Sequence, residues 1–168
     1  MEKLRKGREL IGLSVVELNS GKNLGEVKDI LYSPIENKVM AFLIADNGWF
    51  WGAKVLPYEE ALYIGRDMVM VSDAGKIHNT KYHSDYNKMY QDRIDIRGCQ
   101  LISGAGEIMG TIQDIIINPA GRITGYELSN GVIDDILKGR KVLAVPDNMV
   151  ISDDVVIVTA GTNVKNSI

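Results

Sequence analysis

Short apolar segments separated by turn residues recur along the whole chain. In the first half, residues 12–18, 24–32 and 39–45 are rich in β-forming side chains and too short to indicate helices, so they predict strands. The polar cluster at 19–23 and the Asn-Gly pair at 47–48 are typical of tight hairpin turns, which need positive φ angles. This part of the chain is therefore expected to form a sheet of hairpins.

The pattern continues to residue 71. Residues 49–56 and 69–71 predict two further strands. Between them, Pro57 is expected to begin one helical turn, with Glu59 and Glu60 near its positive end.

The second half of the chain repeats the order of the first. At one constant offset, Gly21, Gly25, Val27, Asp29, Ile30 and Pro34 correspond to Gly106, Gly110, Ile112, Asp114, Ile115 and Pro119. After a small slip in register, Phe42, Asn47-Gly48 and Pro57 correspond to Tyr126, Asn130-Gly131 and Pro146. The strands expected in this half lie at 99–102, 108–118, 126–128, 142–145, 149–151 and 155–158. A duplicated framework of glycines, prolines and apolar residues indicates two structural units.

These strands predict an all-β protein made of two small antiparallel β-barrels in tandem, each with about one short helical turn. Full closure of a barrel also removes exposed strand edges. The first barrel is expected at residues 1–75, a linker or short helix at 76–93, and the second barrel at 94–168.

The segment between the repeats is polar and rich in tyrosine. Tyr82, Tyr86, Met89 and Tyr90 recur at helical spacing, which indicates a short helix or an ordered strap across the barrels. An extended linker is the alternative, although solvated linkers are more often rich in Gly, Ser or Pro.

Composition excludes several classes of protein. A net charge of −3 and a pI near 5.4 give no general attraction to nucleic acid or anionic membranes. The single cysteine, Cys99, has no internal partner for a disulfide, and no apolar run is long enough to cross a bilayer. No apolar stretch of signal-peptide length follows the N-terminus, so we expect a cytoplasmic protein without membrane insertion.

No group of residues has the spacing of a catalytic, cofactor or metal site. The glycines of residues 104–110 have the wrong spacing for a dinucleotide loop and predict a hairpin turn. Asp29 and Asp114 belong to different repeats, so each is expected to serve its own fold, on a solvated strand face or in a turn hydrogen bond. The possible metal ligands His78, His83, Asp85 and Cys99 lack the close spacing of a metal site. We therefore expect neither an enzyme nor a cofactor.

The order of motifs in residues 25–71 resembles a known family. These residues read Gly-Glu-Val-Lys-Asp-Ile, Ser-Pro, an apolar run, Asp-Asn-Gly-Trp-Phe-Trp-Gly, Lys-Val-Leu-Pro-Tyr-Glu-Glu-Ala and Met-Val-Met-Val. This order resembles the PRC-barrel domain, the small β-barrel of the photosynthetic reaction centre H subunit and of a ribosome maturation factor that docks on a ribosomal protein. Residues 110–158 resemble a second, more divergent copy, as in the free-standing tandem PRC-barrel proteins of bacteria.

The resemblance implies a docking or assembly module without a shared catalytic residue. The expected partner is a protein, with ribosomal or RNA-processing components as the class that the resemblance favours, and a homo-oligomer is left open. A membrane-peripheral assembly factor is an alternative implied only by the H subunit.

Trp49 and Trp51 are the strongest candidates for protein docking. They alternate with Phe50 along a predicted strand, so the two tryptophans share one face. If Phe50 fills the core, both tryptophans lie outside and form an aromatic docking surface, whereas the reverse assignment buries them. Tyr82, Tyr86 and Tyr90 are expected to cover this site or a groove between the barrels.

A basic run provides the second hypothesis, an RNA-binding module. Lys138, Arg140 and Lys141 lie close together in sequence and would contact phosphates. Asp134 and Asp135 precede them, which favours a solvated surface instead.

Overall fold

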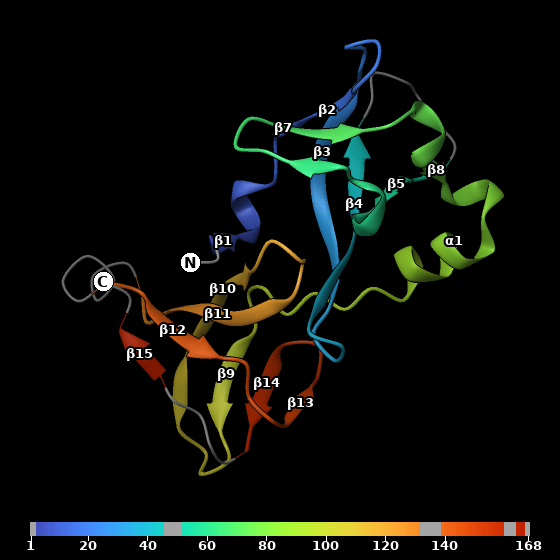
Figure 1. The fold of residues 1–168 in the computed structure, drawn as a ribbon. Helices are drawn as coiled ribbons and strands as arrows, with labels where there is room; N and C mark the ends of the chain where they lie inside the picture. Colours follow the sequence, from blue (N-terminus) through green and yellow to red (C-terminus); the bar gives the residue numbers. More distant parts are fainter. Residues whose placement is uncertain (1–2, 46–51, 132–138, 160–163, 167–168) are drawn as a thin grey trace. The chain divides into compact units, whose positions relative to one another are not determined.

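The computed structural model describes residues 3–45, 52–131, 139–159 and 164–166. The chain forms two compact units, each with its own sheet (Figure 1). The first unit comprises residues 8–33 and 38–94, and the second comprises residues 1–7, 34–37 and 95–168. The units are therefore not continuous along the chain, because the N-terminal segment and the turn at 34–37 belong to the second unit.

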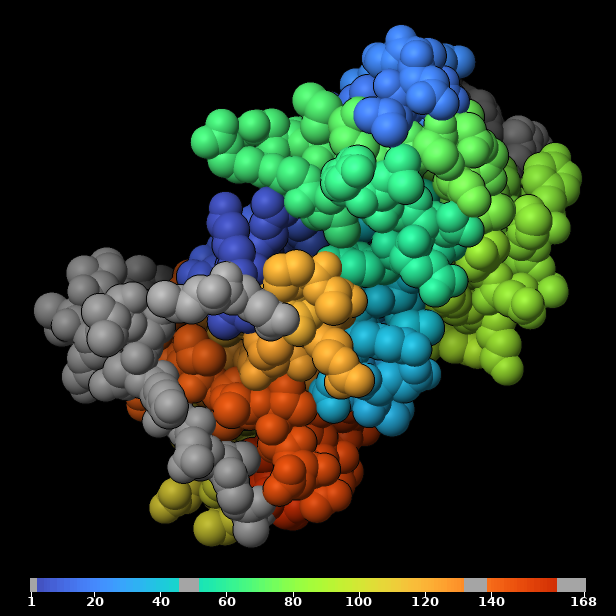
Figure 2. All heavy atoms as spheres, in the orientation of Figure 1, coloured from blue at the N-terminus to red at the C-terminus, as the bar shows by residue number. Residues whose placement is uncertain are grey.

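The first unit is a sheet with the strand order β6-β7-β2-β3-β4-β5-β8. Its strands are β2 (Ser14–Glu17), β3 (Asn23–Ser33), β4 (Lys38–Ala45), β5 (Lys54–Pro57), β6 (Tyr63–Ile64), β7 (Met68–Val71) and β8 (His78–Asn79). Its 3-10 helices are η1 (Gly7–Glu9, which begins at the boundary of the two units), η2 (Tyr58–Glu60), η3 (Ala74–Lys76) and η4 (Thr80–Tyr82). The α-helix α1 (Ser84–Gln91) follows η4. Figure 2 shows the β6–β7 hairpin, in green, at the surface of this unit.

The second unit repeats the order of the strands, as β13-β14-β9-β10-β11-β12-β15, but its described residues after position 95 contain no helix. Its strands are β9 (Gln100–Ser103), β10 (Ile108–Ile117), β11 (Ile123–Ser129), β12 (Lys141–Ala144), β13 (Met149–Ile151), β14 (Val155–Val158) and β15 (Val164–Asn166). The short N-terminal strand β1 (Arg5–Lys6) also pairs with β10. The prediction of two similar, mostly β units is confirmed.

The expectation of purely antiparallel sheets is wrong at one strand pair in each unit. β2 and β7 pair in parallel, and so do β9 and β14. β7 lies beside β2, and β14 lies beside β9, only after the intervening hairpins. This long connection allows the two strands of each pair to run parallel. Within the described residues, neither strand order closes into a ring of hydrogen bonds.

The long hairpins follow the sequence pattern closely, whereas the shortest elements do not. β3 ends at Ser33, before the turn that Pro34 begins, and β4 matches the apolar run at 39–45 to within one residue. Pro57 occupies the N-cap position of η2, so it directly precedes the first residue of this helix instead of forming it. The two-residue strands β1, β6 and β8 carry too few residues for a periodic signal, so the sequence did not predict them.

A glycine and an aspartate recur at the same irregular place in each sheet. Gly25 and Gly110 have φ angles of 137° and 143°. Register shifts follow at Val27/Asp29 and at Ile112/Asp114, and Asp29 and Asp114 each accept a hydrogen bond of 2.8 Å from the next backbone N–H. Each aspartate thus serves its own strand irregularity, as expected, although Asp114 is buried rather than solvated.

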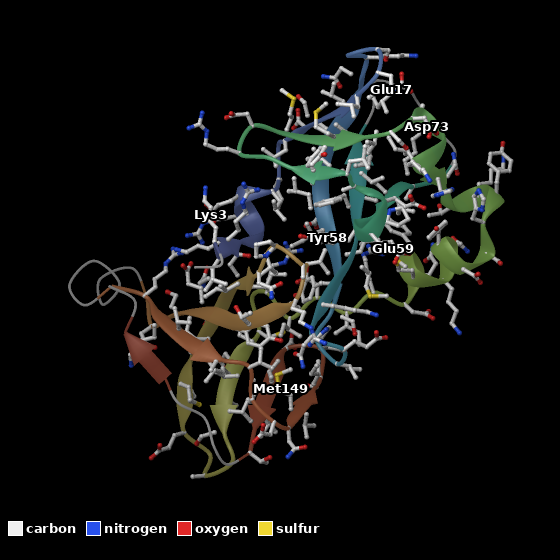
Figure 3. All side chains as sticks on the ribbon, in the orientation of Figure 1. Lys3, Glu17, Tyr58, Glu59, Asp73 and Met149 are labelled. Carbon is white, nitrogen blue, oxygen red and sulfur yellow. The ribbon has the colours of Figure 1, made fainter. Side chains whose placement is uncertain are left out.

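The inward faces of the strands form a separate apolar core in each unit. The first core includes Val15, Val27, Ile30, Phe42, Leu56, Val69 and Val71, and the second includes Leu101, Ile112, Ile115, Tyr126, Leu128, Leu143 and Val156. Phe42 stacks on Tyr58, which is labelled in Figure 3, with ring centroids 5.4 Å apart. Its counterpart Tyr126 is also fully buried, and its hydroxyl has no hydrogen-bond partner among the described residues. Burial raises the pKa of Tyr126 to about 12.

Replacing Tyr126 with the residue of the first repeat should stabilise the second unit. Tyr126→Phe removes a buried, unpaired hydroxyl, whose desolvation costs about 1–3 kcal/mol, and keeps the ring. We expect the free energy of unfolding to rise by about 1 kcal/mol in urea titrations. The reciprocal change, Phe42→Tyr, should be destabilising because it buries a hydroxyl in the first core. A loss of stability in Tyr126→Phe would show that the hydroxyl is paired in solution.

Candidate protein-docking surface

The outward face of the first sheet carries a row of apolar side chains across three strands. Tyr63 of β6 pairs with Met70 of β7, and Met70 pairs with Val16 of β2. Tyr63 is 66% exposed, and the other two are half-buried, whereas Val69 and Val71 face the core. We call Tyr63, Met70 and Val16 the first apolar row. Outward positions of a sheet that faces water are usually polar, so this row is unusual.

The second sheet carries the same row at the equivalent strands. Val150 of β13 pairs with Ile157 of β14, and Ile157 pairs with Ile102 of β9. Ile102 also pairs with Ile108 of β10, so the row spans four strands. Val150 and Ile108 are 61% and 67% exposed. We call Val150, Ile157, Ile102 and Ile108 the second apolar row.

The two rows differ in the charges beside them. The turn between β13 and β14 carries Asp153 and Asp154, both exposed, next to the second row. The turn between β6 and β7 carries Arg66 and Asp67, which form an ion pair at 3.3 Å. The second row therefore has an acidic border, whereas the charges beside the first row compensate each other.

The two tryptophans that the sequence singled out, Trp49 and Trp51, lie outside the described residues. The described part of this connection begins at Gly52 and leads into β5. Their assignment to a docking face stays a prediction.

The tyrosines of the segment between the repeats have different environments. Tyr86 and Tyr90 of α1 are half-buried and, with Met89, pack against the cluster of Leu31, Ala41 and Val55. Tyr82, at the end of η4, is 74% exposed. Tyr86 and Tyr90 thus contribute to the packing of the first unit itself, and only Tyr82 presents most of its surface to solvent.

Two histidines help to hold α1 on the sheet. The His78 ring of β8 stacks on Tyr86, with centroids 4.6 Å apart, and contacts His83 edge-on at 4.9 Å. Burial, followed by the proximity of His83, lowers the pKa of His78, while nearby Glu60 opposes this shift. Because these contacts favour neutral imidazole, His78 acts here as a packing residue.

The basic run proposed for RNA contact is only partly described, because Lys138 lies outside the described residues. Arg140 forms an ion pair of 2.7 Å with Glu127, which is 1% exposed, and Lys6 of β1 forms a second ion pair with Glu127. When the amide group of Asn130 is turned so that its oxygen and nitrogen exchange places, its oxygen lies 3.1 Å from Lys141 Nζ and accepts a hydrogen bond from it. Arg140 and Lys141 thus have partners within the second unit, and Arg140 compensates a buried charge.

In the described residues, neither the cysteine thiol nor the possible metal ligands have the surroundings of a reactive site. Cys99 is buried, and its thiol donates to the backbone oxygen of Asp153 at 3.7 Å. Burial, together with the nearby Asp154, Asp95 and Asp153, raises the pKa of this thiol and disfavours the reactive thiolate. No three His, Cys, Asp or Glu side chains within the described ranges form a group that could hold a metal ion.

The two apolar rows were not predicted from the sequence, although a signal for them was present. Met68–Val71 and Val155–Val158 are continuous runs of four apolar residues. Since successive side chains of a strand point to opposite faces, such a run places apolar residues outside as well as inside. Cross-strand pairing then decides whether these outward residues meet.

The family of this chain follows from its similarity to known proteins. A search of curated proteins finds no match. No helix in the described residues is long and apolar enough to cross a membrane. The model of the PRC-barrel domain family matches residues 2–77 and again residues 93–164. These matches cover both repeats and most of the chain, which therefore belongs to the PRC-barrel domain family as a tandem, two-copy member.

Proposed function

We propose that this protein is a non-catalytic cytoplasmic adaptor whose two apolar rows dock a basic partner protein. The observation that carries the proposal is the recurrence of an outward apolar row at equivalent strands of both units. Each sheet is proposed to curl into a closed barrel. The linking segment is proposed to serve as an ordered element between the barrels.

The chemistry of the rows supports a protein partner. Large apolar side chains that are contiguous on a surface are typical of interaction sites, whereas single exposed ones are not informative. Aromatic and methionine side chains, such as Tyr63 and Met70, are also enriched at protein interfaces.

The charges favour a basic partner. Asp153 and Asp154 border the second row, and the chain as a whole is acidic. Complementary charge increases the rate and selectivity of association. Proteins of the ribosome or of RNA processing carry basic surfaces because they bind nucleic acid, so they match this border.

The proposal predicts that a bound partner depends on the apolar rows. A tagged wild-type chain, isolated from its native cells at moderate salt after nuclease treatment, should retain a basic protein. Tyr63→Thr combined with Ile157→Thr should reduce its recovery about tenfold, which corresponds to about 1.4 kcal/mol of binding free energy. Leu18→Ser is the matched control, because Leu18 is 49% exposed but lies in the β2–β3 turn, outside both rows.

The outcomes separate the alternatives. Equal recovery by the row variant and the wild type would refute docking at the rows. Self-association of the wild type that the row variant abolishes would assign the rows to a second copy of the chain. Trp49→Ala with Trp51→Ala, and Tyr82→Ser, tested in the same way, would show whether these predicted residues add to the interface.

A further inference from the structure

The second apolar row ends at a strand that has a neighbour on one side only. β13 is the first strand in the order of the second sheet and, among the described residues, pairs with β14 alone. Figure 1 shows β13 beside β14 at the margin of this sheet. Val150, at the centre of β13, is the last residue of the row, so the row stops at an open strand edge. Backbone groups at such an edge can pair with a further strand.

The turn after β13 determines which backbone groups face this edge. The N–H of Ser152 donates to the oxygen of Val155 at 2.9 Å, which makes these two residues a hydrogen-bonded pair. Because bonded and non-bonded pairs alternate along an antiparallel ladder, Val150 is bonded to β14, whereas Met149 and Ile151 are not. The N–H and C=O groups of Met149, labelled in Figure 3, and of Ile151 therefore point to the open edge. Within the described ranges, no other segment forms hydrogen bonds with these groups.

The space beside this edge is partly open. Met149 and Ile151 line one side of a cavity of about 200 Å³, and Ile35 and Asn37 of the turn between β3 and β4 line the other side. The turn therefore lies apart from the edge, and the cavity gives the backbone of an added segment access to β13.

Acidic side chains lie at both ends of the edge. Asp147 precedes β13, and Asp153 follows it in the turn to β14; both are exposed. An extended segment of about seven residues spans roughly 20 Å and reaches both carboxylates. Charge complementarity favours a segment with a basic residue at each end.

The charges also argue against a second copy of the chain as the occupant. Pairing of two β13 strands would bring Asp147 and Asp153 of both copies together, and like charges across a ladder are destabilising. The equivalent edge of the first sheet lacks these features, because β6 has only two residues and Arg66 pairs with Asp67 in its turn.

We propose that the β13 edge binds an extended segment of the basic partner by strand addition, with an apolar residue beside Val150 and basic residues at Asp147 and Asp153. The segment forms backbone hydrogen bonds with Met149 and Ile151, which supply affinity, and its side chains supply specificity. Its apolar residue lengthens the second apolar row by one strand. This inference rests on the proposed docking function, since it states which part of the partner reaches the second row.

The test is a titration of the full-length, ¹⁵N-labelled chain with the acetylated and amidated peptide Arg-Ser-Thr-Val-Thr-Ser-Arg. We expect saturable shifts of the backbone amides of Met149 and Ile151. N-methylation of both threonines removes the donors needed for antiparallel addition, and N-methylation of the valine removes the donor needed for parallel addition. One modified peptide should bind about tenfold more weakly and the other like the unmodified peptide, which identifies the direction of the added strand.

Variants of the chain test the same contacts from the other side. Ile151→Pro removes one N–H at the edge and keeps the bonds of Val150 to β14, so peptide affinity should fall about tenfold. Ile64→Pro is the matched control, because it makes the same change at the edge of β6 and should leave affinity unchanged. Asp147→Asn with Asp153→Asn should weaken binding of this peptide but not of a version with glutamine for both arginines.

Three results would overturn the inference. The first is the absence of saturable shifts at residues 149 and 151. The second is equal binding of the unmodified peptide and both N-methylated peptides, which is measured on the wild type and so does not depend on the folding of Ile151→Pro. The third is self-association of the wild type that Ile151→Pro abolishes, which would assign the edge to a second copy.

Recovery of the partner protein separates this inference from the proposed function. If Tyr63→Thr with Ile157→Thr loses the partner and a folded Ile151→Pro retains it, the rows dock the partner and strand addition is refuted. If both variants retain the partner and the peptide still binds as expected, docking at the rows is refuted and the β13 edge remains a peptide-binding site.

Discussion

Gly25→Ala should lower the free energy of unfolding of the first unit by about 3–4 kcal/mol, from backbone strain and overpacking together. Gly25 has a φ of 137°, a conformation that side-chain-bearing residues rarely adopt. A Cβ atom at this position would lie 2.6 Å from the backbone oxygen of Ala45 and 2.8 Å from the Ile44 methyl group Cγ2. Because the oxygen belongs to the neighbouring strand, β3 and β4 would have to separate locally. Urea titration followed by circular dichroism measures the loss.

Gly21→Ala is the matched control for this prediction. Gly21 also has a positive φ, 70°, but an added Cβ would meet nothing within 4 Å. This variant should therefore lose only the strain contribution, about 1–2 kcal/mol. Gly110→Ala should behave like Gly25→Ala in the second unit, because its Cβ would lie 2.9 Å from the backbone oxygen of Ser129. Equal losses for Gly25→Ala and Gly21→Ala would contradict the steric explanation.

Removal of both cations beside Glu127 is expected to destabilise the second unit by about 3–5 kcal/mol. The carboxylate is 1% exposed and contacts Lys6 from β1 and Arg140 from the segment before β12. Lys6→Ala or Arg140→Ala alone leaves one of these cations, so each single variant should lose about 1–2 kcal/mol. The loss in the double variant should exceed the sum of the single losses, since a buried charge then loses both ion pairs. Thermal and urea unfolding of the four proteins form the required double-mutant cycle.

The control for this cycle neutralises the buried charge. Adding Glu127→Gln to the double variant should recover most of the lost stability, because a neutral amide is less costly to bury than a carboxylate. If the stability losses of the two single variants simply add, and Glu127→Gln restores no stability, then burial of the charge does not determine the loss in the double variant. The cycle is also needed to interpret tests of RNA binding. If Arg140→Ala binds RNA more weakly, the loss of a contact with RNA has to be distinguished from the loss of stability of this variant.

The local features of the fold were predictable because they depend on neighbouring residues. Residues 24–32 and 39–45 have the apolar content of strands, and Pro34 between them cannot continue a β ladder. The repetition of Gly25 at Gly110 also indicates two units, because both glycines occupy the same strained place in their sheets. The family resemblance, which rests on these positions, is confirmed.

Most of the candidate site was not predictable in the same way. Tyr86 and Tyr90 were expected to cover a docking site, but in the structure they pack on Leu31, Ala41 and Val55. Arg140 looked like part of a basic surface, yet it compensates a glutamate that lies thirteen positions away in the chain. A charge count along the sequence cannot distinguish these cases, because it contains no information on which side chains meet.

The sequence by itself determined the longer strands, most of the turns between them and the duplication of this protein. These properties follow from alternation of side chains, from the φ angles that glycine and asparagine allow, and from the missing N–H of proline. Only the tertiary structure decided that β1 pairs with β10, that the turn at 34–37 belongs to the second unit, and that apolar residues of three or four strands form one row. Such contacts join residues far apart in the chain, and their selection depends on burial and pairing summed over a whole unit rather than on any local pattern.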